Sequence, residues 1–154
     1  MPHTLPAVEE ARAVLAVFAD LPVTSSVSAF GPARYHVRGR NGGLLHDVNV
    51  YVHSLEEAVT FAHEARAHLS IPPVWTAYAG QPIQWAGGFM AVRKACFPRG
   101  GRFRSARSVN VAALLREAGI REEYRAAWRS GARDYLRLLW AAVNTEGSVP
   151  QAAD

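Results

Sequence analysis

Cationic side chains crowd one short segment, "RKACFPRGGRFRSARS", which spans residues 93–108. It holds six Arg and Lys residues and no carboxylate. Arg presents a planar fork of donors, so several Arg residues along a loop can follow a phosphate backbone without reading its sequence. Gly100 and Gly101 let the backbone turn, and Phe103 has a ring that can stack on a base. The segment therefore predicts an anion-binding site formed by Arg93, Lys94, Arg99, Arg102, Phe103, Arg104 and Arg107.

The charge of the whole chain is distributed unevenly around this segment. Residues 1–64 carry seven acids and four cations, residues 65–116 carry eight cations and no acid, and residues 117–154 carry six acids and five cations. Clustered Arg raises the local concentration of anions such as nucleic acid or acidic protein surfaces. A hydrated loop is the alternative interpretation, because a connection between two elements is normally exposed.

A second row of arginines follows near the C-terminus at four-residue spacing: Arg121, Arg125, Arg129, Arg133 and Arg137. Four-residue steps keep such a row on one broad face of a helix. Glu117 can pair with Arg121, Glu122 with Arg125 and Asp134 with Arg137. Arg129 and Arg133 have no acid three or four residues away. We therefore add Arg129 and Arg133 to the predicted anion-binding site. A solvated helix face and a helix-turn-helix over residues 111–128 are the alternatives.

A third group of polar residues lies on a predicted hairpin over residues 33–54. Asn41-Gly42 favours a two-residue turn, because both positions accept positive φ. That turn places His36 opposite Asp47, where a carboxylate can orient the imidazole as a general base. If the protein is an enzyme, its catalytic residues are then His36, Asp47, Tyr51 and His53. A plain solvated face is the alternative, since antiparallel sheets often leave one face in water.

Signals for metals and cofactors are weak. Cys96 is the only cysteine, which excludes an internal disulfide and a thiolate cluster. His63 and His68 are five residues apart on a predicted helix, so they do not share a face. No phosphate-binding loop, dinucleotide fingerprint or nucleophile elbow is present. We expect neither a metal site nor a cofactor.

The elements that position these residues follow from hydrophobic spacing and turn signals. Helices are predicted over residues 5–22, 54–69, 111–118 and 121–143. Ser54, three residues before Glu57, is predicted to cap the second helix, and Ser108 or Asn110 the third. Besides the hairpin, strands are predicted over residues 23–30, 74–79, 83–86 and 89–97, the last two being separated by Gly87-Gly88. Alternation along the hairpin assigns a core face to Tyr35, Val37, Val48, Val50 and Val52. The order α-βββ-α-βββ-αα predicts an α+β fold, with helices on one face of a mainly antiparallel sheet of five or six strands.

The chain of 154 residues fits a single domain, which we place at residues 1–143, followed by a flexible tail at 144–154. The first twenty residues lack the basic start and apolar centre of a secretory signal, and no long apolar run is present, so we expect a cytoplasmic protein without a membrane partner. The leading hypothesis is a small module that binds a polyanion, above all nucleic acid. The alternatives are a module that docks an acidic protein, as an inhibitor, immunity or accessory factor does, and a small enzyme. Formation of a homodimer is left open.

Overall fold

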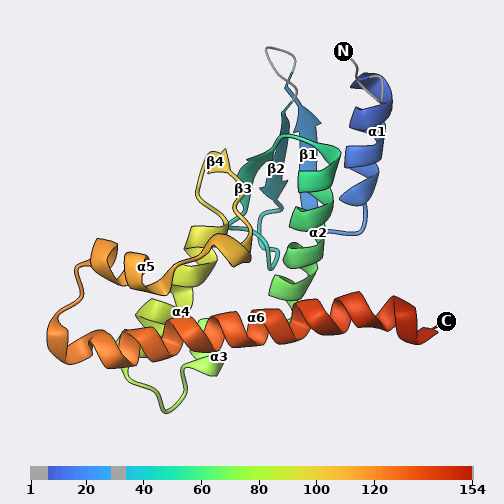
Figure 1. The fold of residues 1–154 in the computed structure, drawn as a ribbon. Helices are drawn as coiled ribbons and strands as arrows, with labels where there is room; N and C mark the ends of the chain where they lie inside the picture. Colours follow the sequence, from blue (N-terminus) through green and yellow to red (C-terminus); the bar gives the residue numbers. More distant parts are fainter. Residues whose placement is uncertain (1–6, 29–33, 154) are drawn as a thin grey trace. The chain divides into compact units, whose positions relative to one another are not determined.

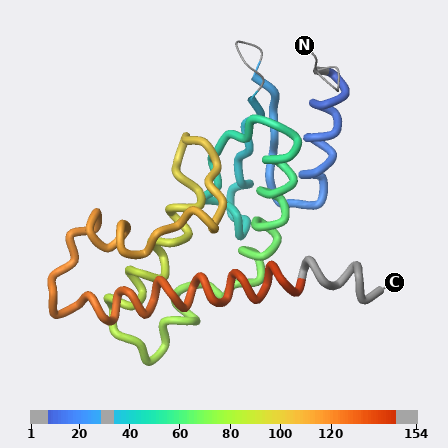
Figure 2. Tube along the Cα trace, in the orientation of Figure 1, coloured from blue at the N-terminus to red at the C-terminus, as the bar shows by residue number. Residues whose placement is uncertain are grey.

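The computed structural model describes residues 7–28 and 34–153, and the side chains of residues 8–28 and 34–145. The chain divides into two compact units. Unit 1 consists of Met1–Ala65 and Phe97–Phe103, and unit 2 consists of Arg66–Cys96 and Arg104–Asp154. The chain therefore enters each unit twice, a path that can be followed by colour in Figure 2. The expected single domain over residues 1–143 stays a prediction.

Unit 1 is built on a four-stranded mixed sheet with the order β1-β2-β3-β4. The strands β1, β2 and β3 pair antiparallel, whereas β4 pairs with β3 in parallel. Figure 1 shows this sheet beside the helices α1 and α2. In chain order the elements are α1 (Ala7–Val17), β1 (Val23–Val27), β2 (Tyr35–Gly39), β3 (Asn49–Val52), α2 (Leu55–Leu69, which continues into unit 2) and β4 (Gly101–Arg102). The α+β class is confirmed, with four strands in the described residues instead of five or six.

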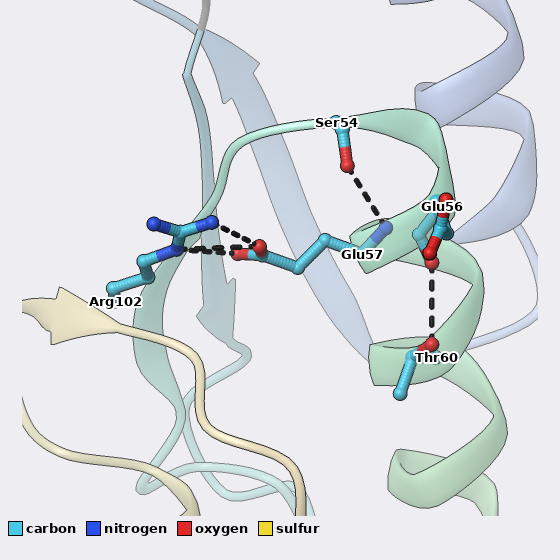
Figure 3. A network of polar contacts seen from close by, with 5 residues as sticks. All are labelled: Ser54, Glu56, Glu57, Thr60 and Arg102. Carbon is cyan, nitrogen blue, oxygen red and sulfur yellow. Dashed lines mark hydrogen bonds and ion pairs between the residues drawn. The ribbon is translucent and has the colours of Figure 1, made fainter.

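The core of unit 1 lies on one face of the sheet. Val37 and Val50 are fully buried, whereas their neighbour Arg38 is exposed, so the helices cover one side only. Phe61 of α2 is at the centre, where its ring meets Phe18 edge-on at a centroid distance of 5.7 Å. The start of α2 is capped as the sequence predicts, because the Ser54 hydroxyl accepts a hydrogen bond from the Glu57 amide at 3.1 Å (Figure 3).

The hairpin forms, but its predicted register is wrong. Nine residues, Arg40–Val48, connect the strands, and His36 faces Tyr51 instead of Asp47. A two-residue turn would leave Leu45 on the solvent face, whereas the longer connection buries it completely. The partner of His36 moves by four residues, an even number, so each side chain keeps its face. The predicted core residues of the hairpin are accordingly all buried: Tyr35, Val37, Val48, Val50 and Val52.

The regular elements of unit 2 in its described residues are all helices. Its elements are the C-terminal part of α2, α3 (Val74–Ala77), α4 (Ile83–Cys96), η1 (Ala106–Ser108), α5 (Val111–Ala118), η2 (Glu122–Tyr124) and α6 (Arg125–Ala153). The strands predicted over residues 74–79, 83–86 and 89–97 are therefore wrong, and so is the predicted element order. Asn110 caps α5, as one of two predicted caps, by accepting a hydrogen bond from the Ala113 amide at 3.1 Å. Residues 144–153 continue α6, and the flexibility of this tail stays a prediction.

The helices α4 and α6 cross at a pair of glycines. A Cβ atom placed on Gly88 would overlap the backbone carbonyl of Trp128, and one placed on Gly131 would overlap that of Trp85. Each glycine therefore lets one helix touch the backbone of the other. Beside the crossing, the indole nitrogen of Trp85 donates to a carboxylate oxygen of Asp134 at 2.8 Å. The Gly87-Gly88 pair, predicted as a turn between strands, thus lies within a helix for a packing reason.

Substitution at these neighbouring glycines should have opposite effects. Gly88→Ala forces the helices apart and should lower the free energy of unfolding by about 2 kcal/mol or more. Gly87→Ala is the matched control, because its added Cβ would lie 3.5 Å from the Trp128 ring, an ordinary contact. Alanine favours a helix, so the control should be neutral or stabilising by up to about 1 kcal/mol. Denaturant unfolding followed by circular dichroism measures both, and equal effects would contradict the described crossing.

Tyr35 ties β2 to α1 through its hydroxyl group. The hydroxyl donates a hydrogen bond to Glu10 Oε1 at 2.6 Å, and the Tyr35 side chain is 1% exposed. Burial, followed by the hydrogen bond to Glu10 and its negative charge, raises the pKa of Tyr35 to about 12. The fold therefore favours the neutral phenol over the phenolate.

This shift predicts a specific loss of stability at alkaline pH. The contribution of Tyr35 is fully present below the unfolded pKa near 10 and is lost as pH rises through about 12. Tyr35→Phe keeps the ring but removes the ionisation, and it should be less stable than the native protein by about 1 kcal/mol at pH 8. Between pH 10 and 12 the gap between the two proteins should close. Unfolding curves across this range test it, and a gap independent of pH would refute it.

Candidate nucleic-acid interface

The predicted anion-binding residues are divided between the two units. Unit 1 holds three of them: Arg99, Arg102 and Phe103. Unit 2 holds the other six: Arg93, Lys94, Arg104, Arg107, Arg129 and Arg133. The cationic segment is therefore not one continuous loop. It consists of the end of α4, the short strand β4 and the turn η1.

Arg102 is held by a carboxylate of its own unit. Its Nη2 atom lies 2.7 Å from Glu57 Oε2, and its Nε atom donates to both carboxylate oxygens at 3.2 Å (Figure 3). The hydrogen bond to Glu57 and the negative charge of Glu57 raise the pKa of Arg102. An anion that binds Arg102 must compete with Glu57, so this guanidinium is a weaker candidate than the sequence indicates. Arg99 is exposed and forms no ion pair with any described side chain.

Phe103 does not serve as a stacking platform. Its side chain is 6% exposed and packs edge-on against Phe61, with the ring centroids 5.2 Å apart. The Phe103 amide donates to the Tyr51 carbonyl at 2.9 Å, which extends the pairing of β4 with β3 by one residue. Strand alternation then turns Phe103 inward, next to the outward Arg102. The prediction that Phe103 stacks on a base is therefore wrong.

Arg93 and Lys94 form the last turn of α4, not a strand. Lys94 is exposed and Arg93 is half-buried. Cations at this end of a helix interact favourably with the helix dipole, so part of their role is structural. Lys94 points its charge to solvent and is the more available of the two for an anion.

Arg104 precedes the turn η1 and Arg107 lies within it. A buried side chain and a hydrogen-bonded cap hold this turn in place. Ala106 is 3% exposed, and the Ser105 hydroxyl caps η1 by accepting from the Arg107 amide at 3.2 Å. The Arg107 guanidinium lies over the ring of Trp140, 5.5 Å from its centroid, which is cation–π geometry. Both arginines are exposed. Sequence reasoning missed Trp140, because no local spacing connects α6 with a turn more than thirty residues earlier.

The arginine row on α6 forms fewer ion pairs than its spacing predicts. The predicted pair between Asp134 and Arg137 is present at 3.1 Å. Arg121 instead pairs with Glu123 at 3.2 Å, and Arg125 donates to the backbone carbonyl of Ile120. Arg129 donates to the Arg125 carbonyl, and Arg133 is exposed. Neither of these two forms an ion pair with a described side chain, as the sequence predicts.

The net charge differs sharply between the units. Unit 2 contains eleven Arg and Lys residues and six Asp and Glu residues, a net charge of +5. Unit 1 contains six and seven, a net charge of −1. Asp134, one of the acids of unit 2, is already engaged by Trp85 and Arg137. The positive field of the protein therefore originates in unit 2.

The structure does not bring together His36 and Asp47, the central pair of the catalytic arrangement predicted on the hairpin. His36 is opposite Tyr51 and its Nε2 atom is 2.6 Å from Asn49 Oδ1, so Asp47 does not orient it through the predicted register. His53 lies just after β3 and is half-buried. A hollow of about 340 Å³ in unit 2 is lined by none of these hairpin residues but by others, among them Arg66, Ser70 and Thr145. Among the described residues, no group of three or more His, Cys, Asp and Glu side chains is placed to hold a metal ion.

Comparisons of the chain with models of protein families, with curated proteins and with solved structures find no match. Within the described residues, no helix is both long and apolar enough to cross a membrane.

Proposed function

We propose that the protein is a small module that binds nucleic acid through the phosphate groups, with unit 2 as the main contact. The observation that carries this proposal is the net charge of +5 on unit 2, together with exposed cations that have no acidic partner among the described side chains. These cations include Lys94, Arg104 and Arg133. Clustered, uncompensated cations attract a polyanion and release its counterions on binding.

The geometry of the cations favours contacts with phosphates over contacts with bases. Arg104 and Arg107 extend from a short anchored turn, and Arg133 extends from a helix, so no contiguous reading element is formed. In the helix-turn-helix alternative, α5 would need a buried face, yet none of its residues is fully buried. Phosphate contacts fix position without specifying sequence. The proposed activity is therefore binding with little sequence preference and strong dependence on salt.

The α6 helix offers a charge-matched test of this proposal. Arg133→Gln and Arg137→Gln each remove one positive charge from the same helix, but only Arg137 is already paired with Asp134. Arg133→Gln should weaken binding to a DNA duplex and reduce the slope of log affinity against log salt by about one. Arg137→Gln should have a clearly smaller effect. Fluorescence anisotropy at two salt concentrations measures both.

Two results would overturn the proposal. The first is no binding of the native protein to single-stranded or duplex oligonucleotides at the lower salt concentration. The second is binding whose affinity does not change with salt, because phosphate neutralisation requires counterion release. Unfolding curves for each variant confirm that the fold is intact.

A second candidate function is docking to an acidic protein. The observation that favours it is on unit 2, where Trp75 of α3 is 75% exposed and Ile83 at the start of α4 is 67% exposed. A large aromatic side chain left in water is typical of a binding hot spot, and the net positive charge of unit 2 can steer an acidic partner. The same charges that serve nucleic acid also serve this role.

Trp75→Ser separates the two candidate functions. Trp75 is too exposed to support the core, so the variant should fold with little change in stability. If a protein partner docks here, a stoichiometric partner captured from nuclease-treated lysate should be lost with Trp75→Ser. Arg133→Gln should keep the partner, with any loss of affinity confined to low salt, because salt screens the charge that it removes. Capture that Trp75→Ser leaves unchanged would exclude this surface as the docking site.

A further inference from the structure

The open face of the sheet in unit 1 presents two rows of polar side chains. The strand register aligns Thr24 of β1 with Arg38 of β2 and Asn49 of β3. It aligns the second row in the order Ser26, His36, Tyr51 and Arg102, across all four strands. Neither row contains a carboxylate.

The absence of acids from this face is not a result of composition. Unit 1 has one more acid than it has cations. Five of its seven acids lie on α1 and α2, the helices that pack against the other face: Glu9, Glu10, Glu56, Glu57 and Glu64. A solvated face normally mixes charges of both signs. The charged side chains in the two rows of the open face are instead all cations, of which Arg102 is already paired with Glu57.

Aromatic rings occupy the middle of the same face. His36 and Tyr51 stack across β2 and β3, with centroids 4.6 Å apart and ring planes inclined by 27°. The guanidinium of Arg34 lies 5.4 Å from the Tyr51 centroid, and Asn49 Oδ1 lies 2.6 Å from His36 Nε2. Both rings are half-buried, so their orientation is held while part of each remains accessible. The result is a stacked pair of partly accessible rings on the open face of the sheet.

We infer that this face binds single-stranded nucleic acid, with a base added to the His36–Tyr51 pair and phosphates bound by Arg34 and Arg38. Aromatic rings on an open sheet suit unpaired bases, because each base offers a π-face that a duplex keeps inside its own stack. A protein partner fits less well, since the two rows lack the apolar centre typical of a protein interface. The inference does not rest on the cations of unit 2, which form a separate contact.

Substitution of Tyr51 tests the stacking directly. Tyr51→Leu removes the aromatic plane but keeps apolar bulk, whereas Tyr51→Phe keeps the plane and is the matched control. Tyr51→Leu should weaken binding of a labelled oligothymidine by about tenfold relative to Tyr51→Phe. It should leave affinity for a duplex unchanged. Equal single-strand affinity of the two variants would overturn the inference.

An exposed cation gives a second test that does not disturb a ring. Arg38→Gln changes a side chain that faces solvent, so folding is not at risk. It should reduce the salt slope of oligothymidine binding by somewhat less than one, the value for one phosphate on a single strand being about 0.7. An unchanged slope would count against the inference even if Tyr51→Leu fails to fold.

The same assays separate this inference from the proposed role of unit 2. If Arg133→Gln weakens both ligands and Tyr51→Leu weakens neither, the sheet face is excluded and unit 2 remains the contact. If Tyr51→Leu weakens the single strand while Arg133→Gln changes nothing, the sheet face stands and the role of unit 2 is overturned. No binding of either ligand by the native protein overturns both.

Discussion

The contact between Gly88 and Gly131 sets the geometry of unit 2. Because each glycine admits the backbone of the opposite helix, α4 and α6 pack at a distance that any side chain would forbid. This contact between the two glycines fixes the position of Lys94, at the end of α4, relative to Arg133 on α6. It also forms the support for η1, which lies against α4 while Arg107 reaches Trp140 on α6. The positions of the cations therefore depend on two residues that carry no charge.

Sequence patterns predicted the features of the fold that depend on interactions between residues close together in the chain. The Ser54 cap, the Asn110 cap and the hairpin faces follow from hydrogen bonding and side-chain alternation over a few residues. The α4 helix escaped prediction because "FMAVRKACF" is rich in apolar and aromatic residues and follows a Gly-Gly pair. Glycine inside a helix and glycine in a turn have the same local signature. Only the partner helix, more than thirty residues away, distinguishes them.

The candidate site was predictable in its charges but not in its surroundings. Counting residues locates the excess of cations, and the pair between Asp134 and Arg137 follows from helical spacing. Phe103 points inward and Arg102 pairs with Glu57 only because β4 joins the sheet. No short sequence pattern predicts that pairing. The stack of His36 on Tyr51 depends on a register set by the burial of Leu45. Each of these results requires tertiary contacts.

The sheet of unit 1 takes its fourth strand from a segment that follows α4 in the chain. During synthesis on the ribosome, β1, β2 and β3 emerge first. The edge of β3 then stays unpaired until about fifty further residues have been added, because only then can Gly101 pair with Val50. An unprotected strand edge is prone to join another chain. Until β4 arrives, the β3 edge of the nascent chain therefore lacks the strand that covers it in the folded sheet.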